Sequence, residues 1–450
     1  MNLKKIIRLL ILISGYLLLG FGLYSGTLLI TGGIFSVAET LLVCALPFIA
    51  MYSFFVYPII GIAMNRLHRR NKKIRFVPLI IGGIILIFNI LPFVGISTTI
   101  AQGNTQFQAV FGPDYINHIP ENLTAKFKTQ PFDLWQMYNN YESYECNVTY
   151  NCGPYLTVPG VNDEFYFDYY SPKTGDGPFP TIINIHGGAW VIGNKGLENR
   201  PTASRYLAHQ GYCVFDIQHG LGRFPEDPLI DNTLGWVQSL LGRDLLNKSY
   251  TITEMAIQIM GNFTDYLVAH ADLYKVDTNR IYVTGNSAGA HLAGLFLGYN
   301  STYKSIFNDT LQLKGLILFY CPANLTHLYN YHAADPLAHL FNIDIGYFFS
   351  QVAGGTPQEN ATLFENLSPV FLADSSAPPV LILHGQIDNM VPFIEAKQLH
   401  EKLLSVGRPS IFLSFPHQGH AFDYFFNSPG GQVSMFFIER FLAATQYIEV

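Results

Sequence analysis

The pattern of hydrophobic positions changes near residue 100. Before this point three long apolar runs dominate the chain, at residues 6–30, 41–64 and 77–100. Each run is long enough for an α-helix to cross a hydrocarbon layer about 30 Å thick. A cleaved signal peptide does not explain the first run, because the run is too long and two more follow it. The pattern predicts a membrane region at residues 1–100 with three transmembrane helices, rather than two spans and an interfacial segment.

Beyond residue 160, short apolar runs alternate with amphipathic stretches. Strands are predicted at residues 165–170, 181–185, 212–217, 280–284, 313–319, 379–383 and 410–415, and helices at 197–210, 253–273, 290–297, 394–406 and 432–444. Nearly continuous apolar strands that alternate with helices are typical of a mostly parallel sheet with helices on both faces. Residues 161–450 are therefore predicted to form one α/β domain. Residues 101–160, rich in Asn, Tyr and Gln, are expected to be a membrane-proximal linker.

Charge sets the expected orientation of the membrane region. Only 13% of the residues are charged, and the densest basic run lies at residues 65–75, between the second and third apolar runs. The positive-inside rule places this loop and the N-terminus, with Lys4, Lys5 and Arg8, in the cytosol. Everything after residue 100 is then luminal or extracellular. The basic run is too short and too closely enclosed by apolar segments to indicate a nucleic-acid partner.

Nine Asn-x-Ser/Thr sequons follow residue 100. About three would be expected by chance, and the motif is used only in a secretory lumen, so their number supports a luminal or extracellular domain. The candidate glycosylation sites are Asn122, Asn147, Asn247, Asn262, Asn300, Asn308, Asn324, Asn360 and Asn366.

The five cysteines are too few for a disulfide scaffold. Cys146 and Cys152 flank a five-residue segment and are expected to be able to close a small disulfide loop in an oxidising lumen. Cys213 and Cys321 stand beside apolar strand-like runs and are predicted to be buried thiols.

The Gly-x-Ser-x-Gly sequence at Gly285–Gly289 lies between a predicted strand and a predicted helix. Such a sharp turn, called a nucleophile elbow, lifts the Ser hydroxyl clear of a sheet. Residues 186–190, His-Gly-Gly-Ala-Trp, follow another strand. Two successive glycines allow backbone N–H groups to turn toward a developing oxyanion, as acyl transfer requires. Because His186 belongs to this turn, we expect it to brace the loop rather than act as a base.

A carboxylate and an imidazole follow the last two predicted strands. Asp388 comes after residues 379–383, and His420 after residues 410–415. An attacking serine needs an imidazole within hydrogen-bond reach, and the imidazole needs a carboxylate that fixes its tautomer. Either residue alone is more often structural. Together with Ser287 they occur in the order of an α/β-hydrolase triad.

The region from about 165 to 445 resembles the carboxylesterase and lipase branch of the α/β-hydrolase superfamily. It looks closest to hormone-sensitive-lipase-like esterases, feruloyl-esterase-like hydrolases and plant isoprenylcysteine methylesterases. The motifs that carry the resemblance lie at residues 186–190, 285–293, 384–392 and 419–422. The resemblance implies an α/β-hydrolase fold without cofactor or metal, with Ser287 as nucleophile, His420 as base and Asp388 as orienting acid. It also implies an oxyanion hole formed by the N–H groups of Gly187, Gly188 and Ala288.

Two segments depart from the family pattern. At residues 218–223, where relatives often have a Tyr-Arg-Leu-like stretch, this chain has Gln-His-Gly-Leu-Gly-Arg, and the segment that continues to residue 253 is longer than usual. Residues 324–364, which are rich in Leu, Tyr and Phe, are predicted to form a lid. These apolar side chains line a pocket or touch lipid, or else simply pack on the hydrolase core.

The sequence therefore predicts a membrane-anchored serine hydrolase of carboxylic esters, with hydrophobic small-molecule or lipid esters as substrates. Two alternatives remain at this point. A serine peptidase of the prolyl-oligopeptidase type would need a propeller domain, for which the chain has no room. A non-catalytic, cholinesterase-like adhesion protein would not need the complete triad.

Overall fold

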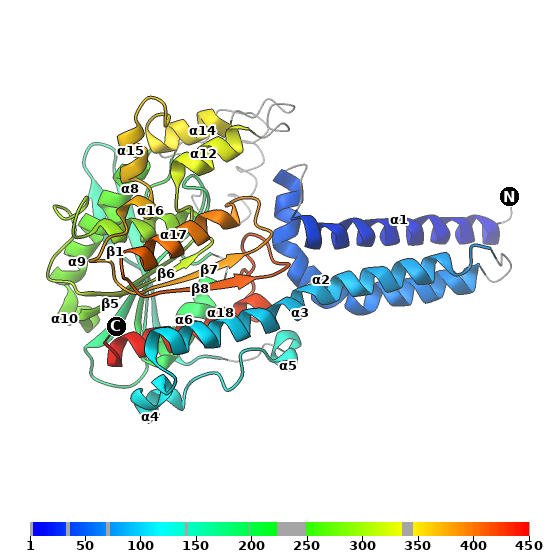
Figure 1. The fold of residues 1–450 in the computed structure, drawn as a ribbon, viewed down its shortest axis with the longest axis horizontal. Coiled ribbons are helices and arrows are strands. Elements are labelled where there is room, and N and C mark those ends of the chain that lie inside the picture. The colour runs from blue at the N-terminus through cyan, green and yellow to red at the C-terminus, as the bar shows by residue number, and fades with distance from the viewer. Residues whose placement is uncertain are drawn as a thin grey trace.

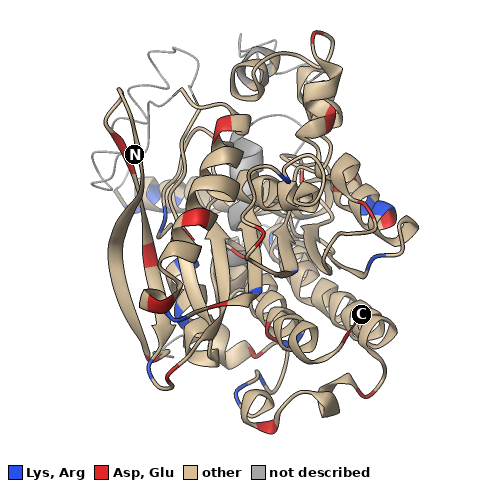
Figure 2. Cartoon of the chain, turned by 90° about the vertical axis from the view of Figure 1, so that its left-hand side faces the viewer, with Lys and Arg blue, Asp and Glu red and all other residues tan. Residues whose placement is uncertain are grey.

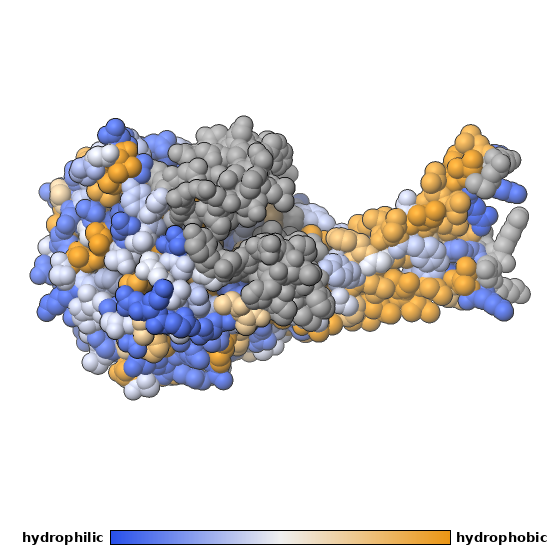
Figure 3. All heavy atoms as spheres, turned by 90° about the horizontal axis from the view of Figure 1, so that it is seen from above, coloured by the Kyte–Doolittle hydropathy of each residue, from blue (hydrophilic) through white to orange (hydrophobic). Residues whose placement is uncertain are grey.

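The computed structural model describes residues 3–32, 37–68, 73–139, 143–197, 199–222, 249–334 and 345–449. A bundle of three long helices projects from a globular part (Figure 1). The helices are α1 (Leu3–Thr31), α2 (Val37–Leu67) and α3 (Val77–Phe111), and each contains a stretch long and apolar enough to cross a membrane. Hydrophobic surface covers the bundle between a hydrophilic tip and the more hydrophilic globular part (Figure 3). This surface is compatible with membrane anchoring.

Within the described residues, eight strands form one sheet in the order β1-β2-β4-β3-β5-β6-β7-β8. The strands are β1 (Cys146–Val158), β2 (Asp163–Pro172), β3 (Phe179–Ile185), β4 (Cys213–Ile217), β5 (Val276–Asn286), β6 (Leu313–Phe319), β7 (Val380–Gly385) and β8 (Ser410–Phe415). The first two pairings in this order are antiparallel and the other five are parallel. This confirms the predicted mostly parallel sheet.

Helices cover both faces of the sheet, as Figure 1 shows. Successive side chains of a strand point to opposite faces, so Ile183 joins one hydrophobic core and Ile182 the other. The first core contains side chains of α8 (Ile252–Ala256), the π-helix η2 (Ile257–Phe263), α9 (Thr264–Ala269), α11 (Ala288–Gly294), η3 (Leu295–Gly298) and α17 (Phe393–Ser405). The second contains side chains of α6 (Arg200–Gln210), α18 (Pro429–Tyr447) and the end of α3. At the end of the globular part away from the bundle, acidic and basic residues are interspersed (Figure 2).

Residues 101–160 differ from the predicted linker. The helix α3 continues past residue 100 to Phe111, and η1 (Tyr115–His118), α4 (Glu121–Thr124), α5 (Leu134–Tyr138) and β1 follow it. Polar contacts hold this segment on α18, since the N–H of Lys128 donates to Glu439 Oε1 at 2.8 Å. The sheet therefore begins at Cys146 rather than after residue 160. These residues attach through hydrogen bonds and scattered aromatic rings, which leave no periodic apolar pattern in the sequence.

The outer edge of β8 is covered by polar side chains of α3. Gln106 binds both backbone groups of Phe412, donating from Nε2 to its carbonyl at 2.8 Å and accepting its N–H at Oε1 at 2.7 Å. One turn earlier, Gln102 Oε1 accepts the N–H of Ser414 at 3.3 Å, and Thr99 Oγ1 donates to the Ser414 carbonyl at 2.6 Å. An edge strand presents unpaired N–H and C=O groups, and these side chains pair with them.

The predicted disulfide between Cys146 and Cys152 is wrong. Both residues are free thiols on the same strand, β1. Six residues of extended strand span roughly 20 Å, whereas a disulfide joins Cα atoms less than about 7 Å apart. Cys213 and Cys321 are buried thiols, as predicted.

The pairing of Gln106 with β8 leads to a first prediction. Gln106→Ala should lower the free energy of unfolding by about 1–3 kcal/mol, because two backbone groups of a buried strand lose their partner. Thermal or denaturant unfolding of the detergent-solubilised protein measures this change. The matched control is Gln108→Ala, since Gln108 is exposed on another face of the same helix. Equal destabilisation by the two variants would show that the edge pairing adds nothing.

Candidate active site

Ser287 occupies the sharp turn between β5 and α11. Its backbone has φ 53° and ψ −122°, a strained conformation that non-glycine residues adopt when the surrounding structure enforces it. The turn is tight enough to require glycine on both sides. A Cβ built on Gly289 would lie 2.2 Å from the carbonyl oxygen of Ile185, and one on Gly285 would lie 2.3 Å from that of Gly289. The local structure is the elbow that the motif predicts.

The loops after β7 and β8 bring the predicted acid and base to this serine. The Oγ of Ser287 lies 2.9 Å from Nε2 of His420, and Nδ1 of His420 lies 2.8 Å from Oδ2 of Asp388. The other carboxylate oxygen of Asp388 accepts the N–H groups of Met390 and Val391, both at 2.9 Å. Three residues that are far apart in the sequence therefore form one continuous hydrogen-bonded relay.

The electrostatics of the relay favour an ionised Asp388. Burial alone would raise the pKa of this carboxyl, but the neighbouring imidazoles of His420 and His384 outweigh burial and hold the pKa well below its usual range. The Nε2 of His384 lies 3.3 Å from Asp388 Oδ2 and donates to the Val391 carbonyl at 2.9 Å. A carboxylate at Nδ1 of His420 keeps the proton on that nitrogen, so Nε2 is left to accept the Ser287 hydroxyl.

The His-Gly-Gly loop lies beside the elbow. A Cβ built on Gly187 would be 3.4 Å from Cβ of Ser287, and Gly188 continues the loop with φ +117°. Ala288 is the first residue of α11, so its N–H has no acceptor within the helix. Backbone groups from both sides of Ser287 are thus available near the reacting position.

His186 braces this loop, in agreement with expectation. Its Nδ1 donates to the Gly187 carbonyl at 2.8 Å, and its ring stacks on that of His219 with centroids 4.1 Å apart. Burial, and then the neighbouring His219, lower the pKa of His186 well below its usual value. His219 belongs to the segment that departs from the family pattern. Residues 223–248 of that segment lie outside the described residues.

Sequence reasoning missed Tyr320 and Asp423. Tyr320 follows β6 with φ +37°, and its ring centroid lies 4.4 Å from that of His420. Its hydroxyl donates to Oδ1 of Asp423 at 2.8 Å, while Nδ2 of Asn286, next to Ser287, lies 3.3 Å from Oδ2. The buried carboxylate of Asp423 therefore connects Tyr320, whose ring lies beside His420, to the turn that holds Ser287. The available signal was a lone acidic residue in the aromatic stretch that follows His420.

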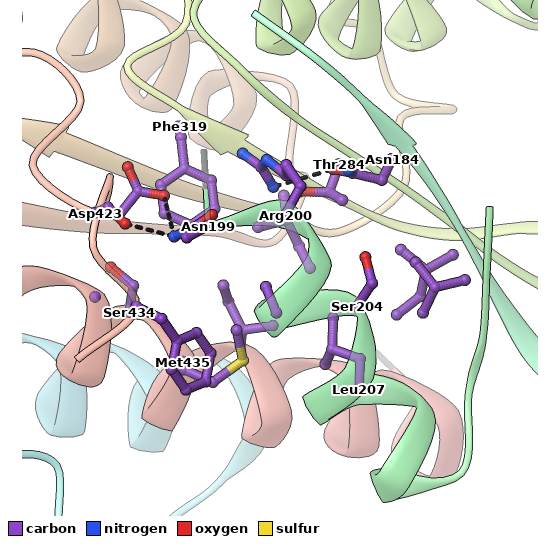
Figure 4. Close-up of a pocket in the computed structure, with 17 residues that line it drawn as sticks. Asn184, Asn199, Arg200, Ser204, Leu207, Thr284, Phe319, Asp423, Ser434 and Met435 are labelled. Atoms are coloured by element: carbon purple, nitrogen blue, oxygen red, sulfur yellow. Dashed lines mark hydrogen bonds between the residues drawn. The ribbon is translucent and has the colours of Figure 1, made fainter. Parts of the chain in front are cut away.

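A small cavity lies behind this carboxylate, on the α6 and α18 side of the sheet (Figure 4). Arg200 Nη1 donates to Asn184 Oδ1 at 3.0 Å, and Asn199 Nδ2 donates to the Asp423 carbonyl. Burial raises the pKa of Asp423, and Arg200 opposes the rise. With about 30 Å³ of space, the cavity is too small for an ester substrate. Ser287 is not among the residues that line it.

The predicted lid is described in part. Its described helices are α12 (Leu325–Ala333), α14 (Ile345–Ala353) and α15 (Ala361–Asn366), whereas residues 335–344 lie outside the described residues. His332 Nε2 donates to the Met390 carbonyl in the loop of Asp388 at 2.8 Å. Leu325, Leu328 and Phe364 are buried in the first core. Part of the apolar character of this segment is therefore core packing.

Among the residues that the structure describes, no group of three or more His, Cys, Asp or Glu side chains is placed to hold a metal ion. The chemistry that the arrangement can perform is nucleophilic attack by Ser287, with His420 as base.

The chain is similar to known proteins in structure and in sequence. Among solved structures, the butyrate-bound esterase Est2 of Thermogutta terrifontis aligns with 67% of this chain and 95% of that chain, at 19% identity and a TM-score of 0.49. The model of the family described as BD-FAE matches residues 167–227 and 250–403.

Two curated relatives bear on the family. The probable carboxylic ester hydrolase LipM of Mycobacterium tuberculosis is 26% identical over 60% of this chain and 56% of its own length. The isoprenylcysteine alpha-carbonyl methylesterase ICME of Arabidopsis thaliana is 25% identical over 60% of this chain and 57% of its own length. The chain thus spans little more than half the length of these relatives. Together with the match to the BD-FAE model, which covers a little less than half of the chain, these relatives support an α/β-hydrolase of the carboxylesterase type.

Proposed function

We propose that the protein is a membrane-anchored serine hydrolase that cleaves carboxylic esters through an acyl-enzyme. The observation that carries the proposal is the relay from Ser287 through His420 to Asp388, with both hydrogen bonds at catalytic distance. Relatives named as ester hydrolases and methylesterases support an ester as substrate.

The proposed reaction follows from the roles of the three side chains. Ser287 Oγ attacks the ester carbonyl carbon while its proton passes to Nε2 of His420, and the ionised Asp388 stabilises the imidazolium that forms. N–H groups of Gly187, Gly188 and Ala288 stabilise the oxyanion. His420 then gives the proton to the departing alkoxide, which leaves as the alcohol. Water attacks the acyl-enzyme in the same way, with His420 again as base, and releases the carboxylic acid.

The membrane part of the proposal rests on the bundle and on charge. The helices α1, α2 and α3 span the bilayer, the N-terminus and residues 65–75 are cytosolic, and the catalytic domain is luminal or extracellular. Five sequons that have an exposed Asn support this orientation: Asn122, Asn147, Asn300, Asn360 and Asn366. Asn262, Asn308 and Asn324 are half-buried, and Asn247 lies outside the described residues.

Hydrophobic esters are the proposed substrates. Anchoring by three helices keeps the domain beside lipid, and α14 brings Phe349 against Trp190 of the His-Gly-Gly loop, with ring centroids 5.8 Å apart. Apolar side chains of the proposed lid therefore reach the loop beside Ser287, where they suit an acyl chain better than a charged substrate.

Labelling with a fluorophosphonate, which reacts with activated serines, tests the nucleophile. Ser287→Ala should abolish labelling and lower kcat by about 10⁴–10⁶-fold, because no acyl-enzyme forms. Ser405→Ala, a change on the exposed end of α17, serves as the control and should retain both the labelling and the wild-type kcat. Labelling that persists in Ser287→Ala would assign the nucleophile to another serine.

Replacing the proposed acid separates its catalytic role from its effect on stability. Asp388→Asn should lower kcat by up to about 10⁴-fold at neutral pH, because the amide favours the wrong tautomer of His420. Asp374→Asn, before β7, is the matched control.

The folded-state pKa of Asp388 lies below its unfolded value of about 3.9. The ionised carboxylate therefore stabilises the fold above that pH, and this stabilisation is lost as the pH falls further. The unfolding midpoint of Asp388→Asn should therefore fall less steeply below pH 4 than that of the wild type. Near-normal turnover by Asp388→Asn would refute the assignment.

Two measurements on the membrane-expressed protein test the orientation. Glycosidase treatment should reduce its apparent mass, because exposed sequons in a lumen carry glycans. Protease added to sealed microsomes should leave the catalytic domain intact and digest it only after detergent is added. Digestion of the domain without detergent would contradict the proposed topology.

A further inference from the structure

The loops that carry the acid and the base rest on the membrane bundle. On either side of Asp388, Asn389 Nδ2 donates to the Gly32 carbonyl at 2.5 Å, and Ile387 packs against a cluster of apolar residues at the ends of α1 and α2. Three residues before His420, His417 Nδ1 donates to the Leu29 carbonyl at 3.1 Å. The cluster packed on Ile387 consists of Leu28, Leu29, Leu46 and Ile49.

The height of these contacts along the bundle can be compared with the thickness of a bilayer. The basic end marks one membrane surface, where the side chain of Arg8 donates to the carbonyl of Leu67. About 20 helical residues, at about 1.5 Å each, cross a hydrocarbon layer about 30 Å thick. Counted from Arg8, Leu67 and the start of α3 at Val77, the opposite boundary falls near residue 28 of α1, 47 of α2 and 97 of α3.

This boundary coincides with the loops of the triad. Leu28 and Leu46 belong to the cluster around Ile387. On α3, Gly95 faces Pro416 so closely that a Cβ on the glycine would lie 2.6 Å from the proline carbonyl oxygen. All three helices thus meet the loops of Asp388 and His420 where the hydrocarbon layer ends.

The short helix α5 lies at the same height and exposes apolar side chains. Tyr138 donates its hydroxyl to the Met51 carbonyl at 2.7 Å, and Phe132, just before α5, packs on Phe93 with ring centroids 6.2 Å apart. Leu134 is 56% exposed and Trp135 is 74% exposed. Tryptophan is enriched at membrane–water interfaces because its ring is amphipathic.

Although α5 exposes apolar side chains, hydrogen bonds hold the helix in place. The N–H of Asp133 donates to Gln432 Oε1 at 2.8 Å, and Asn427 Nδ2 donates to the Met137 carbonyl at 2.8 Å. The helix is therefore held against α18 while Trp135 points away from the protein. Figure 1 shows α5 beside the end of the bundle that joins the globular part.

We propose that the bilayer interface covers α5 and that the Ser287 centre works at this interface on acyl esters whose hydrocarbon chains remain in the membrane. The ester carbonyls of membrane lipids lie where hydrocarbon meets head groups, which is the height of the Asp388 and His420 loops. Such a substrate reaches Ser287 without leaving the bilayer. This inference rests on the proposed ester hydrolase activity and names the physical state of its substrate.

The position of Trp135 can be measured with the full-length protein in phosphatidylcholine vesicles. The fluorescence that disappears in Trp135→Phe reports this one side chain. It should be quenched by phosphatidylcholine brominated near the head-group end of its acyl chains, and only weakly by iodide in the water. Quenching by iodide with none by the brominated lipid would overturn the proposal.

Hydrolysis rates test whether the substrate is taken from the membrane. Trp135→Glu should lower hydrolysis of 4-methylumbelliferyl oleate held in the vesicles roughly fivefold, because a charge at the interface shifts the domain away from it. Hydrolysis of water-soluble 4-nitrophenyl acetate should stay within about twofold, since the triad is untouched. The matched control is Leu273→Glu on α10 (Ala271–Tyr274), where Leu273 is 69% exposed on the globular part away from the bundle. It should change neither activity.

The two esters also distinguish the possible failures. If the wild type hydrolyses neither ester and takes no fluorophosphonate label, the proposed function fails. If it hydrolyses acetate while Trp135→Glu and Leu273→Glu act alike on oleate, the hydrolase stands and the interfacial placement fails.

Discussion

The pairing of α3 with the edge of β8 is the contact on which the placement of the rest depends. Glutamine side chains on one face of a helix satisfy the backbone groups that a ninth strand would otherwise bind. Because α3 runs without a break from the apolar bundle to this edge, the sheet and the bundle have one relative orientation. The loops after β7 and β8 share that orientation, and with them Asp388 and His420, the proposed acid and base. A flexible tether would have left the position of Ser287 relative to the helical bundle undetermined.

The hydrogen-bonded relay combines a strained backbone at Ser287 with a buried charge at Asp388. Ser287 sits in an unfavourable backbone conformation at an elbow too narrow for any side chain at its glycines. Asp388 is buried but stays ionised, since two imidazoles and two N–H groups offset the cost of its burial. Each of these features would destabilise an ordinary fold. The dense cores on both faces of the sheet hold them in place.

The sequence predicts those parts that have a periodic pattern or a tight steric requirement. The strands β6 and β8 match their apolar runs end for end, and the elbow is recognisable because its glycines have no substitute. The ordered structure of residues 101–160 was not predicted, because this segment attaches through glutamine amides, a tyrosine hydroxyl and isolated rings, which leave no periodic pattern in the sequence. Cys146 and Cys152 looked like a loop only while the strand between them was unrecognised. Tyr320 escaped because its contact with His420 depends on how two distant loops meet.

The hydrogen bonds of the Asp423 carboxylate constrain which substitutions this sequence can accept during evolution. Its carboxylate receives hydrogen bonds from Tyr320, Asn199 and Asn286, and Arg200 lies close by in the same buried region. Replacing any one of these groups by an apolar residue leaves the others buried with an unmet partner, which costs more than the bond itself. A replacement of the whole set by apolar residues of similar size avoids that cost. Related sequences are therefore expected to keep or lose these polar residues together, even though the residues stand on separate parts of the chain.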